Sequence, residues 1–163
     1  MTQFDNQYSD KEVNINSIYN CSDIYLFPYA RYALFEALRK LDIKSIYLPS
    51  FICKDILSSI NELSIKYYFY ELDSSFTPYL KDIACDAILF VNYFGFECDI
   101  QPFNIYKNRY NAITIEDNAH GLFSKDKLGS FLGTRGDIGL LSIRKTITLP
   151  NGAALVINND KYK

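Results

Sequence analysis

The chain has few of the residues from which metal sites are built. Its 163 residues include no tryptophan, one histidine and four cysteines. The cysteines stand at positions 21, 53, 85 and 98 and form no CxxC pair, so together with a single histidine they do not make a zinc-ligand pattern. We therefore expect no metal site and interpret the cysteines as reduced, mostly buried thiols.

Neither an excess of positive charge nor a long apolar run is present. Seventeen basic and nineteen acidic residues give a formal net charge of −2, which offers no general attraction to nucleic acid or anionic lipid. Residues 1–13 are polar and lack the apolar stretch of a secretion signal, and no segment reaches the ~18 consecutive apolar residues of a membrane helix. We expect a cytoplasmic protein that binds neither nucleic acid nor membrane.

The composition is that of a single folded domain. The chain is 48% hydrophobic and carries 14 tyrosines and 12 phenylalanines, which is enough apolar surface for one core, and we assign most of these aromatic residues to that core. Residues 1–23 are polar and have no clear period, which predicts a polar lead-in. Residues 24–163 are predicted to form the domain.

Hydrophobic spacing alternates along the chain between helical and extended patterns. Ala33, Ala37 and Leu41 belong to a set that recurs at helical spacing, whereas the run AILFVNY at 87–93 is typical of a strand buried on both faces. The expected helices are 29–41, 54–63 and 101–109, and the expected strands are 45–48, 65–72, 87–93, 112–116, 138–143 and 153–157, the last two as a hairpin or as adjacent strands. This alternation predicts an α/β fold with a three-layer, mostly parallel sheet.

Polar clusters follow three of the predicted strands, at 49–53, 117–120 and 142–146. In open parallel sheets ligands bind outside the carboxyl ends of the strands. The second cluster contains Asp117 and His120, and the third contains Ser142 and Lys145, a set that suits Schiff-base chemistry. A lysine amine attacks a carbonyl only when neutral, which desolvation or a neighbouring cation such as Arg144 favours.

A carboxylate beside a pyridine nitrogen keeps that nitrogen protonated and makes the ring a better electron sink. Asp117 and Lys145 together therefore match a pyridoxal-phosphate (PLP) site. Each residue also has a plain structural interpretation: a lysine and an arginine after a strand are commonly solvated, an aspartate at a strand end commonly caps a turn, and a lone histidine is commonly structural.

Five longer segments resemble the sugar-nucleotide aminotransferases of the DegT/DnrJ/EryC1/StrS family, which are PLP enzymes of fold type I. In the order of the family, they are ARYALFEAL (30–38), IYLPSFIC (46–53), ILFVNYFG (88–95), IEDNAHGLF (115–123) and GDIGLLSIRKTITLPNGAAL (136–155). The resemblance implies the large PLP-binding domain of that fold. It also implies PLP as the cofactor.

The resemblance implies a role for each residue of the polar clusters. Lys145 would carry the cofactor as a Schiff base and, once released, move a proton between the substrate carbon and the cofactor. Asp117 would pair with the pyridinium nitrogen, and His120 would lie beside the ring hydroxyl.

The phosphate of the cofactor would rest on the first long helix. The resemblance implies that the backbone amides of Arg31 and Tyr32 hold it, since free amides and the helix dipole favour an anion there. Ser142 would add a hydroxyl group to the same phosphate.

The chain departs from the family pattern at three positions. Ala30 and Ala153 replace glycines that the family uses near the phosphate-binding helix and after the cofactor lysine. Cys53 stands where the ring-stacking aromatic residue is expected, which leaves Phe51 or Tyr93 for that role.

Family members continue past the lysine into a small C-terminal domain and work as homodimers, so the chain ending at Lys163 is expected to be a truncated first half. The implied function is transfer of an amino group, from glutamate, to a keto-sugar nucleotide for polysaccharide or glycan synthesis. The alternative is a non-catalytic relative that serves as a binding or scaffold domain. A generic nucleotide-binding domain is disfavoured because no GxGxxG or GxxxxGK[ST] motif occurs.

Overall fold

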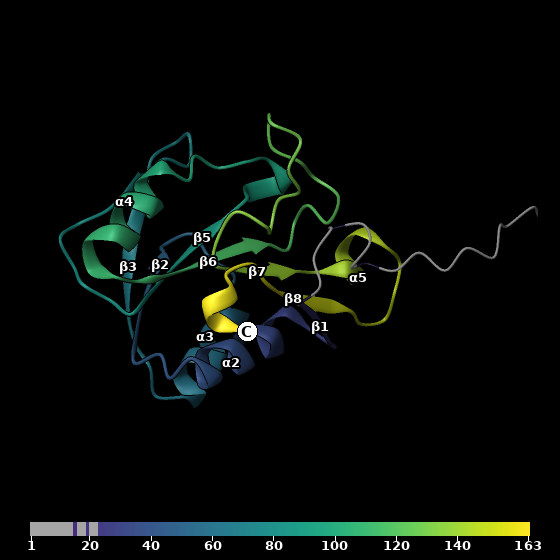
Figure 1. Cartoon of the computed structure of the whole chain (residues 1–163), viewed down its shortest axis with the longest axis horizontal. Helices are drawn as coiled ribbons and strands as arrows, with labels where there is room; N and C mark the ends of the chain where they lie inside the picture. Colours follow the sequence, from purple (N-terminus) through teal and green to yellow (C-terminus); the bar gives the residue numbers. More distant parts are fainter. Residues whose placement is uncertain (1–14, 16–18, 20–22) are drawn as a thin grey trace, which may run out of the picture.

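The computed structural model of the chain describes residues 15, 19 and 23–163. Within these residues one eight-stranded sheet has the strand order β1-β8-β7-β6-β5-β2-β3-β4 (Figure 1). The strands are β1 (Ile24–Phe27), β2 (Ser45–Pro49), β3 (Lys66–Leu72), β4 (Pro78–Tyr79), β5 (Ala87–Val91), β6 (Ile113–Asn118), β7 (Ile138–Leu141) and β8 (Ala153–Ile157). Strands β3, β2, β5, β6 and β7 are mutually parallel, and β8, β1 and β4 pair antiparallel at the two edges.

Helices cover both faces of this sheet. They are α2 (Ala30–Lys40), α3 (Asp55–Glu62), α4 (Gln101–Tyr110) and the one-turn α5 (Ile143–Thr146), with 3-10 turns at Tyr93–Gly95 and Asp160–Tyr162. Helices α2 and α3 lie below the sheet in Figure 1, and α4 lies above it. The chain therefore has the three-layer, mostly parallel α/β fold that its sequence predicts.

Alternation along the strands divides the core between the two helical layers. In β5, Leu89 and Val91 pack with α2 and α3, whereas Ile88 and Phe90 pack with α4. Successive side chains of a strand point to opposite faces, so a strand covered on both sides is apolar at every position. This explains why β5 reads as an unbroken apolar run.

A third apolar cluster covers the end of the sheet that α4 does not reach. Leu141, Ala154 and Val156 pack there against Leu122 and Tyr19. The Tyr19 side chain is buried, and its hydroxyl group donates to the Leu122 carbonyl. Of the predicted polar lead-in, residues 1–14, 16–18 and 20–22 lie outside the described residues.

The sequence predicted α2, α3, α4 and six of the strands closely, but it missed β1, the two-residue β4 and the one-turn α5. Strand β1 is formed by antiparallel pairing with β8, more than a hundred residues away, and carries no internal alternation that would reveal it. The last two predicted strands are adjacent and antiparallel, as β7 and β8. The predicted end of 138–143 was wrong, because the chain turns into α5 after Leu141.

Strand β6 also runs further than predicted. It continues through Glu116 and Asp117 to Asn118, which pairs with Leu141 of β7, and all three side chains are buried. The polar sequence suggested a turn, but tertiary hydrogen bonds satisfy these groups, so the sheet extends through them.

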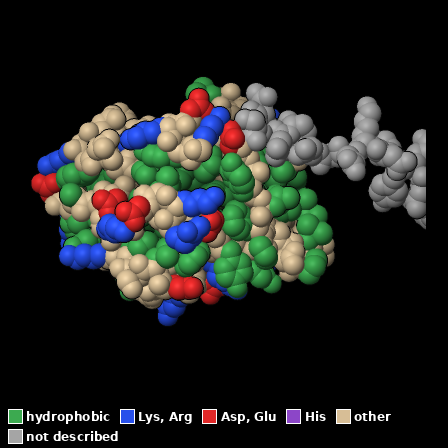
Figure 2. Space-filling model, turned by 60° about the horizontal axis from the view of Figure 1, so that its bottom comes forward, with side chains coloured by type: hydrophobic (Ala, Val, Ile, Leu, Met, Phe, Trp, Pro, Cys, Tyr) green, Lys and Arg blue, Asp and Glu red, His purple; other side chains and the backbone are tan. Residues whose placement is uncertain are grey.

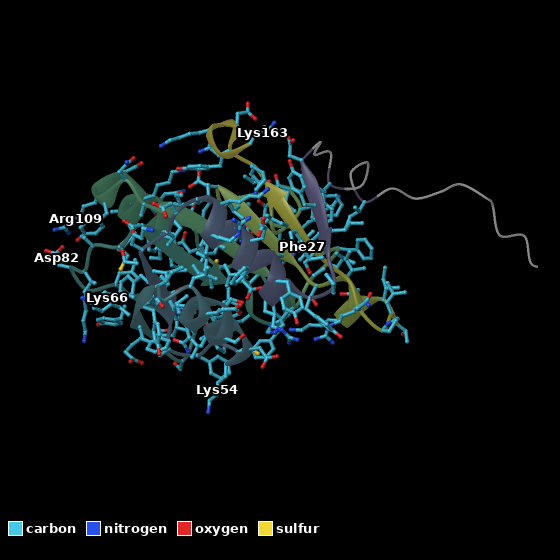
Figure 3. All side chains as sticks on the ribbon, turned by 90° about the horizontal axis from the view of Figure 1, so that it is seen from below. Phe27, Lys54, Lys66, Asp82, Arg109 and Lys163 are labelled. Atoms are coloured by element: carbon cyan, nitrogen blue, oxygen red, sulfur yellow. The ribbon has the colours of Figure 1, made fainter. Side chains whose placement is uncertain are left out.

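The surface carries mixed charge. On the face formed by α2 and α3, basic and acidic side chains are interspersed among apolar ones (Figure 2), and Glu36 pairs with both Arg39 and Lys40 along α2. Lys54, just beyond β2, and Lys163, the last residue, lie on opposite sides of the molecule (Figure 3). In the described part of the chain no helix is long and apolar enough to cross a membrane.

Candidate active site

The sequence-predicted residues meet at the carboxyl edge of the parallel strands. Asp117 lies near the end of β6, Ser142 follows β7, and Lys145 stands in α5. Asp117, Ser142 and Lys145 line one cavity of about 80 Å³ together with the N-terminus of α2. Asp117 and Lys145, which are 28 residues apart in the sequence, therefore line the same cavity, because neighbouring parallel strands end at the same edge of the sheet.

Asp117 is a buried acid without a cationic partner. Its Oδ1 accepts the backbone N–H of Ala119 at 2.9 Å, and among the described residues no lysine, arginine or histidine nitrogen lies within ion-pair distance of it. Burial raises the pKa of Asp117, which the Ala119 amide and the positive charges of Lys145 and His120 partly oppose. Such a carboxylate favours a ligand that brings a protonated nitrogen.

His120 is held with one defined nitrogen facing the protein. Its Nδ1 accepts the backbone N–H of Phe94 at 3.2 Å, and the two rings lie nearly parallel with centroids 6.2 Å apart. Burial and the charge of Lys145 lower the pKa of His120, against the opposing effect of Asp117. The neutral imidazole consistent with this bond carries its proton on Nε2, where it can be donated to an oxygen acceptor.

The N-terminus of α2 presents free backbone amides to the cavity. The Tyr32 N–H donates to the Tyr29 carbonyl at 3.0 Å, so this amide already has a partner. Among the described residues, the N–H groups of Ala30 and Arg31 have no acceptor. Of the two amides predicted for the phosphate, that of Arg31 has no acceptor among the described residues and that of Tyr32 has one, and the amide of Ala30 beside them also has none.

Two guanidinium groups flank these amides. The guanidinium carbons of Arg31 and Arg144 lie 4.7 and 5.2 Å from the centroid of the Tyr29 ring, and Arg31 also pairs with Asp55 at 3.5 Å. Free amides, the helix dipole and these two cations together favour an anion at this position. Ser142 is buried beside it in the wall of the cavity.

Lys145 itself is exposed, as are Arg144 and the rest of 144–151. The 80 Å³ cavity is also smaller than the roughly 300–1,000 Å³ of typical ligand sites. The arrangement therefore supplies the inner wall of a ligand site, and its outer side is open.

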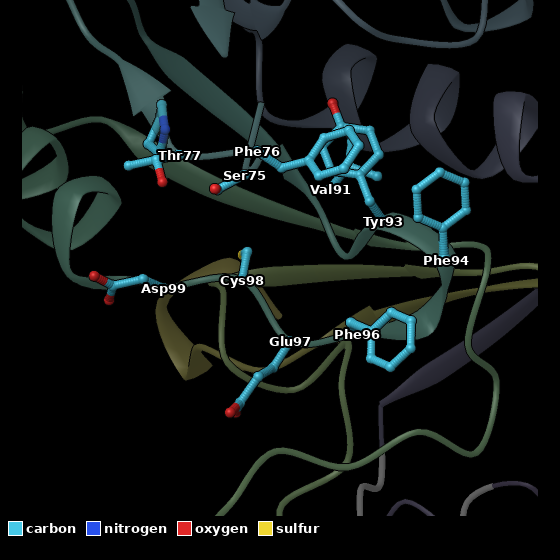
Figure 4. Close-up of a pocket in the computed structure, with 11 residues that line it drawn as sticks. Ser75, Phe76, Thr77, Val91, Tyr93, Phe94, Phe96, Glu97, Cys98 and Asp99 are labelled. Atoms are coloured by element: carbon cyan, nitrogen blue, oxygen red, sulfur yellow. The ribbon is translucent and has the colours of Figure 1, made fainter. Parts of the chain in front are cut away.

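Neither predicted ring-stacking residue lies in the wall of this cavity, which Cys53 lines instead. Phe51 is exposed, and its carbonyl accepts the Tyr93 hydroxyl at 2.6 Å. The Tyr93 ring stacks on Phe76 with centroids 4.6 Å apart, in the wall of a neighbouring pocket of about 360 Å³. Figure 4 shows the aromatic rings of this pocket gathered together and the Glu97 and Asp99 carboxylates pointing away from them.

A set of buried polar residues directly behind Asp117 was not predicted from the sequence. Glu116 has no exposed surface and pairs with Arg135 at 2.8 Å, and both bond to Asn92. The available signal was a glutamate at the end of the predicted strand 112–116, because a carboxylate that becomes buried there requires a cation or several donors. Its partner lies 19 residues away and is not identified by spacing.

The chain resembles known proteins in both sequence and fold. Residues 74–163 match the DegT/DnrJ/EryC1/StrS aminotransferase family. A GDP-perosamine synthase of Escherichia coli O157:H7 is 39% identical over 77 residues, which are 46% of this chain and 21% of that protein.

Among solved structures, a DegT/DnrJ/EryC1/StrS aminotransferase from Brucella abortus is similar with a TM-score of 0.78 at 16% identity, over 91% of this chain and 45% of that one. A GDP-4-keto-6-deoxymannose-3-dehydratase with a trapped PLP–glutamate geminal diamine is similar with a TM-score of 0.76 at 15% identity, over 90% and 42%. The chain thus spans less than half the length of these relatives. PLP is a cofactor of this family, and this chain belongs to the DegT/DnrJ/EryC1/StrS aminotransferase family.

Proposed function

We propose that this chain binds PLP between Lys145 and Asp117 and forms part of an aminotransferase that moves an amino group from glutamate to a keto-sugar nucleotide. The observation that carries the proposal is that Asp117, Lys145 and the free amides of α2 border one cavity. An acid, an amine and an anion site are the three groups needed for the ring nitrogen, the aldehyde and the phosphate of this cofactor. When bound, PLP supplies an electron sink for the carbanion that forms at the substrate carbon.

Each residue has a separate task in this proposal. The Nζ of Lys145 binds the cofactor aldehyde and, when free, carries the proton to and from the substrate carbon. An Asp117 carboxylate oxygen keeps the proton on the ring nitrogen, and the Nε2–H of His120 donates to the ring oxygen. The amides of Ala30 and Arg31, with Ser142, hold the phosphate.

The open outer side of the cavity requires a cover that excludes water from the reacting amine. Exposed apolar rings lie at the neighbouring 360 Å³ pocket: Phe94 and Phe96 line it, and Phe51 packs against Phe76 and Tyr93 of its wall. We propose that a second copy of the chain packs there to form a homodimer, which sedimentation at several concentrations would detect.

The proposal is tested by fixing the cofactor in place. Incubation with PLP followed by borohydride reduction should label Lys145 covalently, and peptide mass spectrometry should locate the label. Lys145→Ala should lose it, whereas Lys54→Ala, which removes another exposed lysine beyond β2, should keep it. A label spread over surface lysines, unchanged in Lys145→Ala, would refute the cofactor site.

The substrate is tested separately. One relative is a GDP-perosamine synthase, so a GDP-linked 4-keto sugar with glutamate is the first pair to try, and release of 2-oxoglutarate measures transfer. The exposure of Lys145 favours a second candidate, a non-catalytic binding domain. That candidate predicts labelling of Lys145 without any release of 2-oxoglutarate.

A further inference from the structure

Glu116 is the most fully buried acid near the candidate site, and both the side chain and the backbone of Arg135 donate hydrogen bonds to its carboxylate. The Arg135 side chain bonds to Glu116 Oε1 at 2.8 Å through Nε, and its backbone N–H bonds to Oε2 at 2.7 Å. The Gly136 N–H adds a third bond at 3.2 Å. Arg135 therefore fixes the position of the Glu116 carboxylate as well as balancing its charge.

Asn92 connects this pair to the strand that carries Asp117. Its side-chain amide donates to Glu116 at 2.8 Å and to Asn118 at 3.4 Å, the residues on either side of Asp117. Its backbone N–H donates to the Asp117 carbonyl at 3.0 Å. Because neighbouring side chains of a strand point to opposite faces, these bonds hold the Asp117 backbone from the side away from its carboxylate.

The same asparagine begins the turn that faces His120. The Gly95 N–H donates to the Asn92 carbonyl at 3.1 Å, and Phe94 between them has a φ of 56°. A left-handed phenylalanine persists only where its surroundings enforce it, and here it aims the Phe94 N–H at His120 Nδ1. Arg135 restrains this turn too, since it donates to Asn92 Oδ1 at 2.7 Å and to the carbonyl of Cys98 at 3.2 Å.

We infer that Arg135 is a positioning residue that acts through Glu116 and Asn92 to hold Asp117 in its orientation toward the cavity and the Phe94 amide in its orientation toward His120. The inference deepens the proposed function and rests on it for its catalytic meaning. Removal of the guanidinium group takes away its bonds to Glu116 Oε1, to Asn92 Oδ1 and to the Cys98 carbonyl, and leaves the buried Glu116 carboxylate without a cation. The turn at Phe94 then relaxes and its bond to His120 weakens.

His120 is the one histidine of the chain, so its NMR signals report this bond without ambiguity and without any cofactor. The charged groups that act on it among the described residues are Lys145 from α5 and Asp117 from β6. Glu116 and Arg135 are not among them. A change in the His120 pKa on substitution of Arg135 therefore reports the movement of the turn.

The test is a pH titration of His120 by NMR. An N–H donated to Nδ1 must be given up when that nitrogen is protonated, so this bond opposes protonation of His120. In Arg135→Met the pKa should rise by roughly 0.5 to 1, the equivalent of one hydrogen bond, with loss of the Nε2–H preference in the nitrogen shifts. Arg135→Lys keeps the positive charge but loses the several N–H donors of the guanidinium group, and it should raise the His120 pKa by less. This variant is used for the test if Arg135→Met does not fold.

Lys107→Met is the matched control. Lys107 pairs with the buried Asp137 at 2.6 Å at the opposite end of β6 and β7, so its loss removes a comparable ion pair away from the turn. It should leave the His120 pKa and tautomer unchanged. An unchanged His120 in the folded Arg135 variants, or an equal shift in Lys107→Met, overturns the inference. Because the apo protein is used, a failure of PLP labelling is a separate result.

Discussion

Two buried aspartates have opposite surroundings: Asp117 lies near the end of β6, and Asp137, just before β7, lies beside Thr114 near the start of β6. Asp137 accepts bonds from Lys107 and Asn159 at 2.6 Å and from the Thr114 amide and hydroxyl at 3.0 and 2.8 Å. These bonds lower the pKa of Asp137 although burial opposes them. Asp117 accepts one backbone amide, and burial raises its pKa.

Asp137 therefore stabilises the fold, whereas the carboxylate of Asp117 is available to bind a ligand. Asp137 ties β6, α4 and the end of β8 together at the amino edge of the parallel strands. Asp117 has unused acceptor capacity and faces a cavity at the carboxyl edge. A cationic ligand binds most favourably at a buried carboxylate for which the protein supplies no cation and few hydrogen-bond donors.

The largest expected difference is in stability. Asp137→Ala leaves a lysine and a buried threonine amide without their acceptor and should lower the free energy of unfolding by about 2 to 4 kcal/mol. Asp117→Asn removes a buried charge that has no ion pair and should change it by less than about 1 kcal/mol. Urea unfolding of the apo proteins checks both. Equal losses would remove the distinction between the two acids.

At the carboxyl edge, where Asp117 lies, we expect a substitution to change the affinity for PLP and to leave stability unchanged. Ala30→Pro removes one of the two free amides, and proline is tolerated at the first helical position. Tyr29 before it is already extended, with φ −142° and ψ 150°, as the residue before a proline requires. We expect roughly tenfold weaker binding of PLP in an absorbance titration, with unchanged stability.

Pyridoxal without its phosphate is the control for this substitution. Its affinity should be the same in the wild-type protein and in Ala30→Pro, because it does not use the helix N-terminus. A parallel loss for both compounds would assign the effect to a distorted helix instead.

The pH dependence of stability should differ in sign between the two aspartates. The stabilisation from Asp137, whose pKa is lowered, is present above the ordinary value of 3.8 and is lost as the pH falls through its folded-state pKa. For Asp117, whose pKa is raised, the folded state is favoured below 3.8 and loses this contribution as the pH rises through its folded-state pKa. Asp117→Asn should therefore flatten the curve above pH 3.8, and Asp137→Asn below it, in thermal unfolding at a series of pH values.

The smallest effect is expected at a surface ion pair. Arg109 and Asp82 lie 2.9 Å apart near one end of the molecule, both largely exposed (Figure 3). Arg109→Leu should change the free energy of unfolding by less than about 1 kcal/mol, and added salt should reduce the difference. If Arg109→Leu lowered the free energy of unfolding as much as Asp137→Ala does, burial would not decide how much an ion pair of these aspartates contributes to stability.

Much of the fold was accessible from the sequence because it depends on local patterns. Helical spacing located α2, α3 and α4, and an unbroken apolar run located β5. Strand β1 and the final residues of β6 were missed. Both depend on pairing with strands distant in sequence, and Glu116 and Asn118 find their hydrogen-bond partners only in the folded chain.

The candidate site divides in the same way. Asp117, Ser142 and Lys145 were predicted together because each follows an apolar run, and parallel strands bring such positions to one edge. The stacking ring was not predictable, since Phe51 and Tyr93 are oriented by contacts with each other and with Phe76.

The amino-acid sequence by itself determined which chemical groups follow which strand, because periodicity and residue order are local properties of the chain. Only the tertiary structure decided how far each of these groups is satisfied: among the described residues the amide of Ala30 has no acceptor and that of Tyr32 has one, and the carboxylate of Asp117 has a single backbone donor whereas that of Asp137 has a lysine and several further donors. The reason is physical: whether a donor or acceptor is satisfied depends on atoms that approach it from remote segments, and the linear sequence does not record those approaches.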